Sequence, residues 1–303
     1  YSNLGVILKD LGKLKEAEDS QMKAIELRPD SAELYFNLAN ILKETGNLEK
    51  SELSLYKAIE LKSDYPEAYL YLSFLELLKG DYQSGLEKYE FRFKIKNTVS
   101  LYGNPKIKRY DKKKLKIGEK LLVVSEQGLG DTLQYMRYIP FLRNKGINIS
   151  FSAQLKLHSL IKVSGIDINP LAPEHVNKIS EGQWIPLLSL PRYLNINPKN
   201  PISSYSYINS TEELVKKWRN ILSAEKKIII GINWQGNRNM EKNYQGRSIP
   251  LEVFSSILKH NDIKLLSLQK GYGSEQINHC SFKDRFVNCQ QQIEGIWDFL
   301  ETA

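Results

Sequence analysis

The residues best able to do chemistry lie in a loop that follows an apolar run. Residues 121–142 read LLVVSEQGLGDTLQYMRYIPFL, so the apolar run stops just before Glu126, and two glycines and Asp131 follow. Gly128 and Gly130 permit positive φ and a close backbone approach, and we expect them to shape the loop. Asp131 has two compatible interpretations. Its carboxylate caps the start of a helix, or it acts as a general base at the mouth of a cleft between two domains.

A second polar cluster follows a later apolar run. The segment INWQGNRNMEKNYQGRSIP spans residues 232–250 and places Asn237 and Arg247 just before a predicted helix. Cations beside a helix N-terminus are suited to binding a diphosphate. Gln269 and Lys270 end the next predicted strand, and the carboxyl ends of parallel strands meet at one edge of a sheet. Each residue alone could be a solvated loop residue, but the set favours a binding site.

Several other chemistries are disfavoured. The glycine loop is not the dinucleotide-binding GxGxxG motif, because Leu133 occupies the third glycine position, and no Gly-Lys-Ser/Thr follows as in a Walker loop. The chain contains no GxSxG, HExxH or Asp-x-Asp motif and no Cys–His pairing. The sequence therefore predicts neither a cofactor nor a metal ion.

The elements that must position these loops alternate between strand and helix from residue 120 onward, which predicts parallel sheets. An irregular stretch at 166–210, with an apolar island at Trp184–Pro191, separates two such runs. The elements expected in the first run are a strand at Lys120–Ser125, a helix at Thr132–Asn144 kinked near Pro140, a strand at 147–152 and a helix at 154–165. The second run is expected to begin with a helix after a capping box of Ser210 and Glu213. It continues with a strand at 227–234, a helix at 249–258, a strand at 263–269 and the start of a helix at 297–303. They predict two Rossmann-like halves, the second incomplete.

Residues 1–95 repeat with a period of 34 residues. The matched positions are aromatic (Tyr1, Tyr35, Tyr69), leucine (Leu4, Leu38, Leu72), glycine (Gly12, Gly46, Gly80) and small (Ala17, Ser51, Gly85). Small residues let paired helices approach closely, and each glycine is expected to end the first helix of a pair. This pattern resembles three tetratricopeptide repeats, the first truncated. The period stops at YEFRF, Tyr89–Phe93.

The net charge of +8 is concentrated in a short segment. Residues 1–95 carry 13 Lys/Arg against 17 Asp/Glu, whereas residues 96–120 carry 9 against 2. A solvated basic linker explains this segment, and a patch that binds an anionic surface is the alternative. No specific binding of nucleic acid is predicted. No apolar run reaches the roughly 20 residues of a membrane helix, and the two cysteines, Cys280 and Cys289, suit a reducing cytoplasm.

Four motifs in the same order resemble one enzyme group. SEQGLGDTLQYMRYIPFL, IPLLSLP, INWQGNRN with RSIPL, and SLQKG are similar to segments of the tetratricopeptide-containing glycosyltransferases related to glycosyltransferase family 9, the heptosyltransferase-like group. The YEFRF ending of the third repeat also resembles the junction in those proteins. The resemblance covers essentially the whole chain.

The resemblance implies a GT-B fold, two Rossmann-like domains with an active site in their cleft, and an inverting, metal-independent transfer. It implies that Asp131 is the general base and that Arg247 contacts the donor diphosphate, with Asn237, Gln269 and Lys270 as donor-side neighbours. The expected partners are a nucleotide sugar and a protein or peptide in the groove of the repeats. Peripheral contact with a membrane is left open, and the location is cytoplasmic in a protein of bacterial type.

The sequence thus predicts an α-helical repeat followed by a GT-B-like α/β pair. The expected divisions are 1–95 for the repeats, 96–119 for the basic linker, 120–209 for the acceptor-side half and 210–303 for an incomplete donor-side half. The family's Asp-Thr/Ser…His…Gly donor segment is absent, so this chain is expected to show weak or no transferase activity. The alternative is an interaction module in which the repeats bind a partner and the α/β part is a non-catalytic scaffold.

Overall fold

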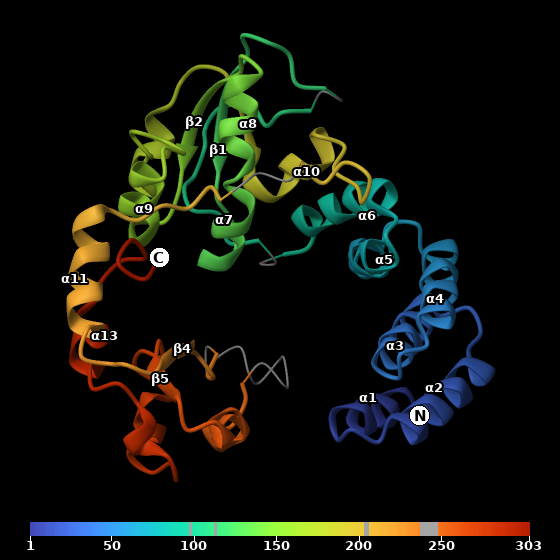
Figure 1. Cartoon of the computed structure of the whole chain (residues 1–303). Coiled ribbons are helices and arrows are strands. Elements are labelled where there is room, and N and C mark those ends of the chain that lie inside the picture. The colour runs from blue at the N-terminus through green and yellow to red at the C-terminus, as the bar shows by residue number, and fades with distance from the viewer. Residues whose placement is uncertain (97–98, 112–113, 203–205, 237–247) are drawn as a thin grey trace. The chain divides into compact units, whose positions relative to one another are not determined.

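The computed structural model describes residues 1–96, 99–111, 114–202, 206–236 and 248–303 (Figure 1). They form two compact units. Unit 1 comprises Tyr1–Gln154 and Asn169–Tyr205, and unit 2 comprises Leu155–Ile168 and Ser206–Ala303. Each unit is described by itself.

Unit 1 begins with paired helices, drawn from blue to teal in Figure 1. Their glycine turns follow the 34-residue period, because Gly12, Gly46 and Gly80 all have positive φ, between 74° and 88°. Such a residue ends a helix at little cost only if it is glycine. The helices are α1 (Ser2–Asp10), α2 (Leu14–Leu27), α3 (Ala32–Glu44), α4 (Leu48–Leu61), α5 (Pro66–Lys79) and α6 (Tyr82–Tyr89).

The small residues of the period lie where paired helices touch. Ala17 and Ser51 are buried, and the Ser51 hydroxyl donates a hydrogen bond of 2.7 Å to the carbonyl of Ala39 on the preceding helix. At Gly85 a Cβ would lie 2.7 Å from Cγ of Leu77 on α5, which is too close. The predicted reason for small residues at these positions is therefore confirmed.

The α/β part of unit 1 is a three-stranded parallel sheet in the order β2–β1–β3. β1 (Lys120–Val124) lies in the centre, between β2 (Asn148–Ser152) and β3 (Gln183–Pro186). Within residues 166–210, which were expected to be largely irregular, the apolar island forms regular elements. Trp184–Pro191 supplies part of β3 and then η4 (Leu187–Ser189) and the start of α10 (Leu190–Tyr193).

The helix expected at Thr132–Asn144 is two helices, α7 (Leu129–Tyr135) and α8 (Tyr138–Asn144). Pro140 lacks the N–H that would bond to the carbonyl of Met136, and its ring crowds that carbonyl. The chain therefore breaks one turn before the proline, and Pro140 lies in the first turn of the new helix, where it is tolerated.

The basic segment is partly built into the sheet. Tyr110 is 3% exposed and its N–H donates to the carbonyl of Trp184, while Arg109 forms a bridge to Trp184 at the edge of β3. Lys106 and Lys108 are exposed, and Ile107 between them is half-buried. A wholly solvated linker is therefore a wrong description of residues 106–110, because alternate side chains pack inward.

Unit 2 contains a two-stranded parallel sheet, β4 (Ile228–Ile232) and β5 (Ile263–Ser267). Its other elements are η2 (Leu155–Leu157), α9 (His158–Val163), α11 (Glu212–Leu222), η5 (Leu251–Lys259), η6 (Ser274–Asn278), η7 (Lys283–Arg285) and α13 (Gln290–Gly295). Trp234, Leu265 and Phe282 belong to its apolar core.

Three local predictions in unit 2 are corrected. The cap of α11 is Thr211, whose side chain accepts the N–H of Leu214 at 3.2 Å, and not Ser210. The helix expected at 249–258 is a 3₁₀ helix, and residues 297–303 form bends and turns. The described residues therefore form a helical repeat and two small parallel sheets, and their pairing as a GT-B fold stays a prediction.

Candidate functional site

A fully buried arginine lies where the helical repeat meets the sheet within unit 1. Arg92 belongs to η1 (Glu90–Lys94), which continues directly from α6, and its side chain is 1% exposed. Its guanidinium stacks on two rings, with its carbon 4.2 Å from the centroid of Tyr89 and 4.3 Å from that of Phe93. Phe91 between them stacks on Tyr69 of α5. The aromatic residues of YEFRF thus anchor η1 and enclose the charge.

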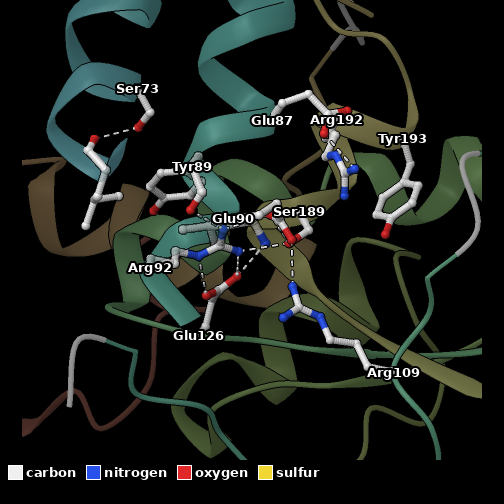
Figure 2. Close-up of polar contacts among 12 residues, drawn as sticks. Ser73, Glu87, Tyr89, Glu90, Arg92, Arg109, Glu126, Ser189, Arg192 and Tyr193 are labelled. Atoms are coloured by element: carbon white, nitrogen blue, oxygen red, sulfur yellow. Dashed lines mark hydrogen bonds and ion pairs between the residues drawn. The ribbon is translucent and has the colours of Figure 1, made fainter. Parts of the chain in front are cut away.

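Glu126, at the carboxyl end of β1, pairs with this arginine in a two-pronged contact (Figure 2). Nε of Arg92 donates to Oε2 of Glu126 at 3.1 Å, and Nη2 donates to Oε1 at 2.9 Å. The backbone N–H of Leu188 donates to Oε1 at 3.1 Å. The Glu126 side chain is 0% exposed, so its charge depends entirely on these donors.

The pair extends into a larger network, also drawn in Figure 2. Glu90 accepts from Nη1 of Arg92 at 2.8 Å and from Nη2 of Arg109 at 2.6 Å. The Ser189 hydroxyl donates to Glu90 at 2.7 Å and accepts from Arg92 at 2.9 Å. Two arginines and two glutamates balance in charge, and they join η1, the basic segment, the β1 loop and η4.

Burial and pairing shift the pKa values of this network in opposite directions. Burial by itself lowers the pKa of Arg92, but its hydrogen bonds and the charges of Glu126 and Glu90 outweigh that effect and leave the pKa above its ordinary value. Burial lowers the pKa of Arg109, and Glu90 offsets only part of the loss. Burial also raises the pKa of the Tyr89 phenol. Arg92 therefore stays charged under all ordinary conditions.

The loop after Glu126 is held by backbone and side-chain contacts. Gln127 has a positive φ of 62°, whereas Gly128 has φ −85° and Gly130 lies inside α7, so the loop does not use the positive φ that these glycines permit. Asp131 is the third residue of α7, and its Oδ2 accepts the N–H of Gly128 at 2.9 Å. The Asp131 side chain therefore lies inside α7 and caps its start by accepting the backbone N–H of the N-cap residue, Gly128.

Asp131 is half-buried, and only its Oδ2 is used by the described residues. The next residue, Thr132, donates its hydroxyl to Gln154 at 2.9 Å, which ties α7 to the end of β2. A carboxylate with one oxygen held by the backbone and the other unused has a fixed direction. This geometry permits a base or a hydrogen-bond acceptor at the carboxyl edge of the sheet.

The other predicted residues lie in unit 2 or outside the described residues. Asn237 and Arg247 are outside them. Gln269 is 5% exposed, and its Oε1 accepts the N–H of Gln235 at 2.9 Å while its amide donates to the carbonyl of Tyr272 at 2.8 Å.

Lys270, also in unit 2, donates from Nζ to the carbonyl of Ile296. The side chains of Gln269 and Lys270 thus form hydrogen bonds to backbone groups of their own unit, and their donor-binding role stays a prediction.

No sequence pattern predicted that four side chains would form one network, namely Glu90, Arg92, Glu126 and Ser189. The available signal was an arginine inside an aromatic run and a glutamate directly after a buried strand, both in motifs already noted. Among the described residues, no group of three or more His, Cys, Asp or Glu side chains is arranged to hold a metal ion. No helix in this part of the chain is long and apolar enough to cross a membrane.

Comparison with known proteins identifies the N-terminal helices. Family models described as tetratricopeptide repeat match residues 1–31 and 21–52. These helices are tetratricopeptide repeats. No curated protein matches the chain.

Solved structures with similar segments include a crystal structure of MamA, which is 28% identical over 31% of this chain and 56% of that chain, with a TM-score of 0.30. The second repeat domain of Spaghetti (RPAP3) bound to an HSP90 peptide is 20% identical over 30% of this chain and 83% of that chain, with a TM-score of 0.29. The TPR2B–pHsp70 complex of yeast Sti1 is 22% identical over 30% of this chain and 73% of that chain, with a TM-score of 0.29. The chain spans about half of the MamA structures it matches.

Proposed function

We propose that this chain is part of a sugar-transfer enzyme whose tetratricopeptide repeats bind a protein partner or acceptor. The observation that carries the proposal is the buried Arg92–Glu126 contact. It connects the last repeat to the residue that begins the loop of Asp131. A partner bound to the repeats is therefore fixed relative to the carboxyl edge of the sheet, where ligands of parallel α/β sheets bind.

Asp131 is the proposed general base. Its Oδ1 accepts no hydrogen bond among the described residues, and Gly128 fixes the direction of the carboxylate. In the proposed reaction this oxygen takes the proton of an acceptor hydroxyl, whose oxygen bonds to the anomeric carbon. The bond to the nucleoside diphosphate breaks, and its electron pair leaves on the diphosphate. Neither a metal nor a cofactor is required in this proposal.

The repeats offer an aromatic surface for the partner. Phe36 of α3 contacts Tyr71 of α5 edge-on at 5.0 Å, and Tyr71 neighbours Phe74, which is 41% exposed. Aromatic residues of this kind supply large apolar contact area at small cost in side-chain entropy. Asn40 has a buried Oδ1 with no hydrogen-bond partner in the described part of the chain. We propose a peptide or protein segment as the ligand of these helices.

Calorimetric titration with nucleoside diphosphates tests the donor side, with Arg247→Ala as the variant. Charge-assisted hydrogen bonds contribute about 1.5–3 kcal/mol each, so binding should weaken roughly 10- to 100-fold. Arg28→Ala, which removes an exposed charge from the repeats, is the matched control and should bind as the wild type does. Equal affinity of wild type and Arg247→Ala would remove Arg247 from the site.

The second candidate is a binding module with a non-catalytic α/β scaffold. The inward bonds of Gln269 and Lys270 favour it, because side chains committed to their own backbone make poor ligand contacts. This candidate predicts no heat with any nucleoside diphosphate while a peptide partner still binds the repeats.

A further inference from the structure

The amino edge of the sheet in unit 1 carries a cluster of cations. The three strands begin at Lys120, Asn148 and Gln183, and because they are parallel these ends share one edge. Every loop that enters a strand there brings positive charge. We call the following residues the amino-edge patch: Lys114, Lys116, Ile117, Lys120, Arg143, Lys145 and Lys178.

Direct contacts hold the first two loops of the amino-edge patch together. The N–H of Gly118 donates to the carbonyl of Gly146 at 2.8 Å, and a Cβ at Gly146 would lie 3.0 Å from Cγ2 of Ile117. One hollow of 570 Å³ is lined by Lys114, Ile117 and Lys145, among others.

A second hollow, of 730 Å³, is lined by Lys120, Arg143 and Lys178 together with other residues of this edge. Ile147 lines both hollows, so the two hollows are neighbours at this edge of the sheet.

Most of this charge is not neutralised. Among the described residues, the carboxylates of Glu119 and Glu181 lie at this edge of the sheet. Glu119 accepts the Tyr110 hydroxyl at 2.8 Å and the backbone N–H of Lys116 at 2.9 Å. Glu181 pairs with Lys120.

Four lysines remain without a carboxylate in ion-pair distance among the residues that the structure describes, namely Lys114, Lys116, Lys145 and Lys178. All four are exposed. The patch therefore keeps a net positive charge.

An apolar side chain lies beside two of these lysines, because Ile117 lines the same hollow as Lys114 and Lys145. Ile117 is 84% exposed, on a turn in which Gly118 has φ +80°. Water solvates this isoleucine poorly, and burial of such a side chain is worth about 1.5–3 kcal/mol. An exposed apolar tip with lysines beside it fits an anionic lipid surface, where the tip enters the boundary between headgroups and acyl chains. A nucleic acid backbone would use the lysines but would gain nothing from Ile117.

We propose that the amino-edge patch docks on membranes that contain anionic lipids, with Ile117 inserted and the lysines on the lipid phosphates. This inference is independent of the proposed sugar transfer. The strands are five residues long or shorter, so the opposite edge with Asp131 lies on the order of 16 Å farther from the lipid.

Vesicle flotation at 0.15 M salt tests the proposal, with neutral phosphatidylcholine vesicles and vesicles that contain 30% phosphatidylglycerol, a composition of about one anionic lipid in three. The wild type should bind only the anionic vesicles. Each lysine near such a surface strengthens binding about fivefold, so Lys114→Gln/Lys116→Gln/Lys145→Gln should weaken binding on the order of 100-fold. Ile117→Ser should weaken it at least about tenfold.

The matched control is Lys50→Gln/Lys199→Gln/Lys226→Gln, which removes the same charge from exposed positions elsewhere. It should bind as the wild type does, and circular dichroism should show all variants folded.

The proposal is overturned if the wild type fails to bind anionic vesicles, if the control loses as much binding as the patch variant, or if Ile117→Ser binds unchanged. Binding of a DNA duplex at the same salt, lost in the patch variant but not in Ile117→Ser, would assign the patch to nucleic acid instead.

Discussion

Substitution of Arg92 should show how much the buried network contributes to the free energy of unfolding of unit 1. In Arg92→Met, the Glu126 side chain would stay at 0% exposure with the N–H of Leu188 as its one remaining donor among the described residues. The two lost bonds, at 3.1 and 2.9 Å, are charge-assisted and worth about 1.5–3 kcal/mol each. Breaking one side of a buried ion pair costs about 3–5 kcal/mol. We therefore expect unit 1 to lose about 3–5 kcal/mol of its free energy of unfolding.

The double variant Arg92→Met/Glu126→Gln gives the sharper test. Glutamine keeps an oxygen for the Leu188 N–H but carries no charge, so the penalty of an unpaired buried carboxylate disappears. The double variant should therefore be more stable than Arg92→Met alone, with a coupling of about 2–3 kcal/mol in the cycle. The exposed Arg28→Met is the control and should stay within about 0.5 kcal/mol of the wild type.

Urea unfolding read by hydrogen exchange of peptides from α5 and β1 measures these free energies within unit 1. The reasoning is refuted if Arg92→Met costs under about 1 kcal/mol, or if the two single costs simply add in the double variant.

Two further perturbations follow from packing. Gly85→Ala should destabilise unit 1 by about 1–2 kcal/mol, because the new Cβ would meet the Leu77 side chain. Gly130→Ala has open space around the new Cβ and should be neutral or stabilise the unit by up to about 1 kcal/mol. Thermal melts of both variants measure these effects, and equal changes in stability would contradict the packing. Burial raises the pKa of the Cys280 and Cys289 thiols, so the stability they contribute is present below the ordinary thiol pKa and is lost as the pH rises above it. At pH 8 a thiol reagent should react slowly with the native chain and fast in urea, and fast native reaction would contradict the burial.

The helical repeat could be predicted because its evidence is local and periodic. A glycine every 34 residues must adopt positive φ, and the small residues must lie at helix contacts, so a single sequence suffices. β3 was missed because it has four residues and ends at Pro186, within a stretch dense in turn-forming residues. The helix break near Pro140 could be predicted because proline has no N–H to continue the helix. The kink expected near Pro140 lies close to the observed break between α7 and α8.

The Arg92–Glu126 pair could not be predicted from pattern alone. The two residues lie 34 positions apart, and their meeting depends on how η1 packs against the end of β1. The positive φ of Gln127 could not be predicted either, because Gly128 and Gly130 are the residues of this loop that adopt such a φ most readily. Local chemistry predicted where the loop is, whereas tertiary packing decides which residue carries its unusual conformation.

The central proposal is that Asp131 serves sugar transfer, and the most direct measurement is release of nucleoside diphosphate from a panel of nucleotide sugars. We predict a slow release, below the usual enzyme rates of about 1–1,000 per second, that Asp131→Asn lowers by about 100-fold or more. Asp111→Asn, an exposed carboxylate of the same unit, is the control and should leave the rate unchanged. An equal rate in Asp131→Asn, or release by the wild type at the usual enzyme rates, would contradict the account.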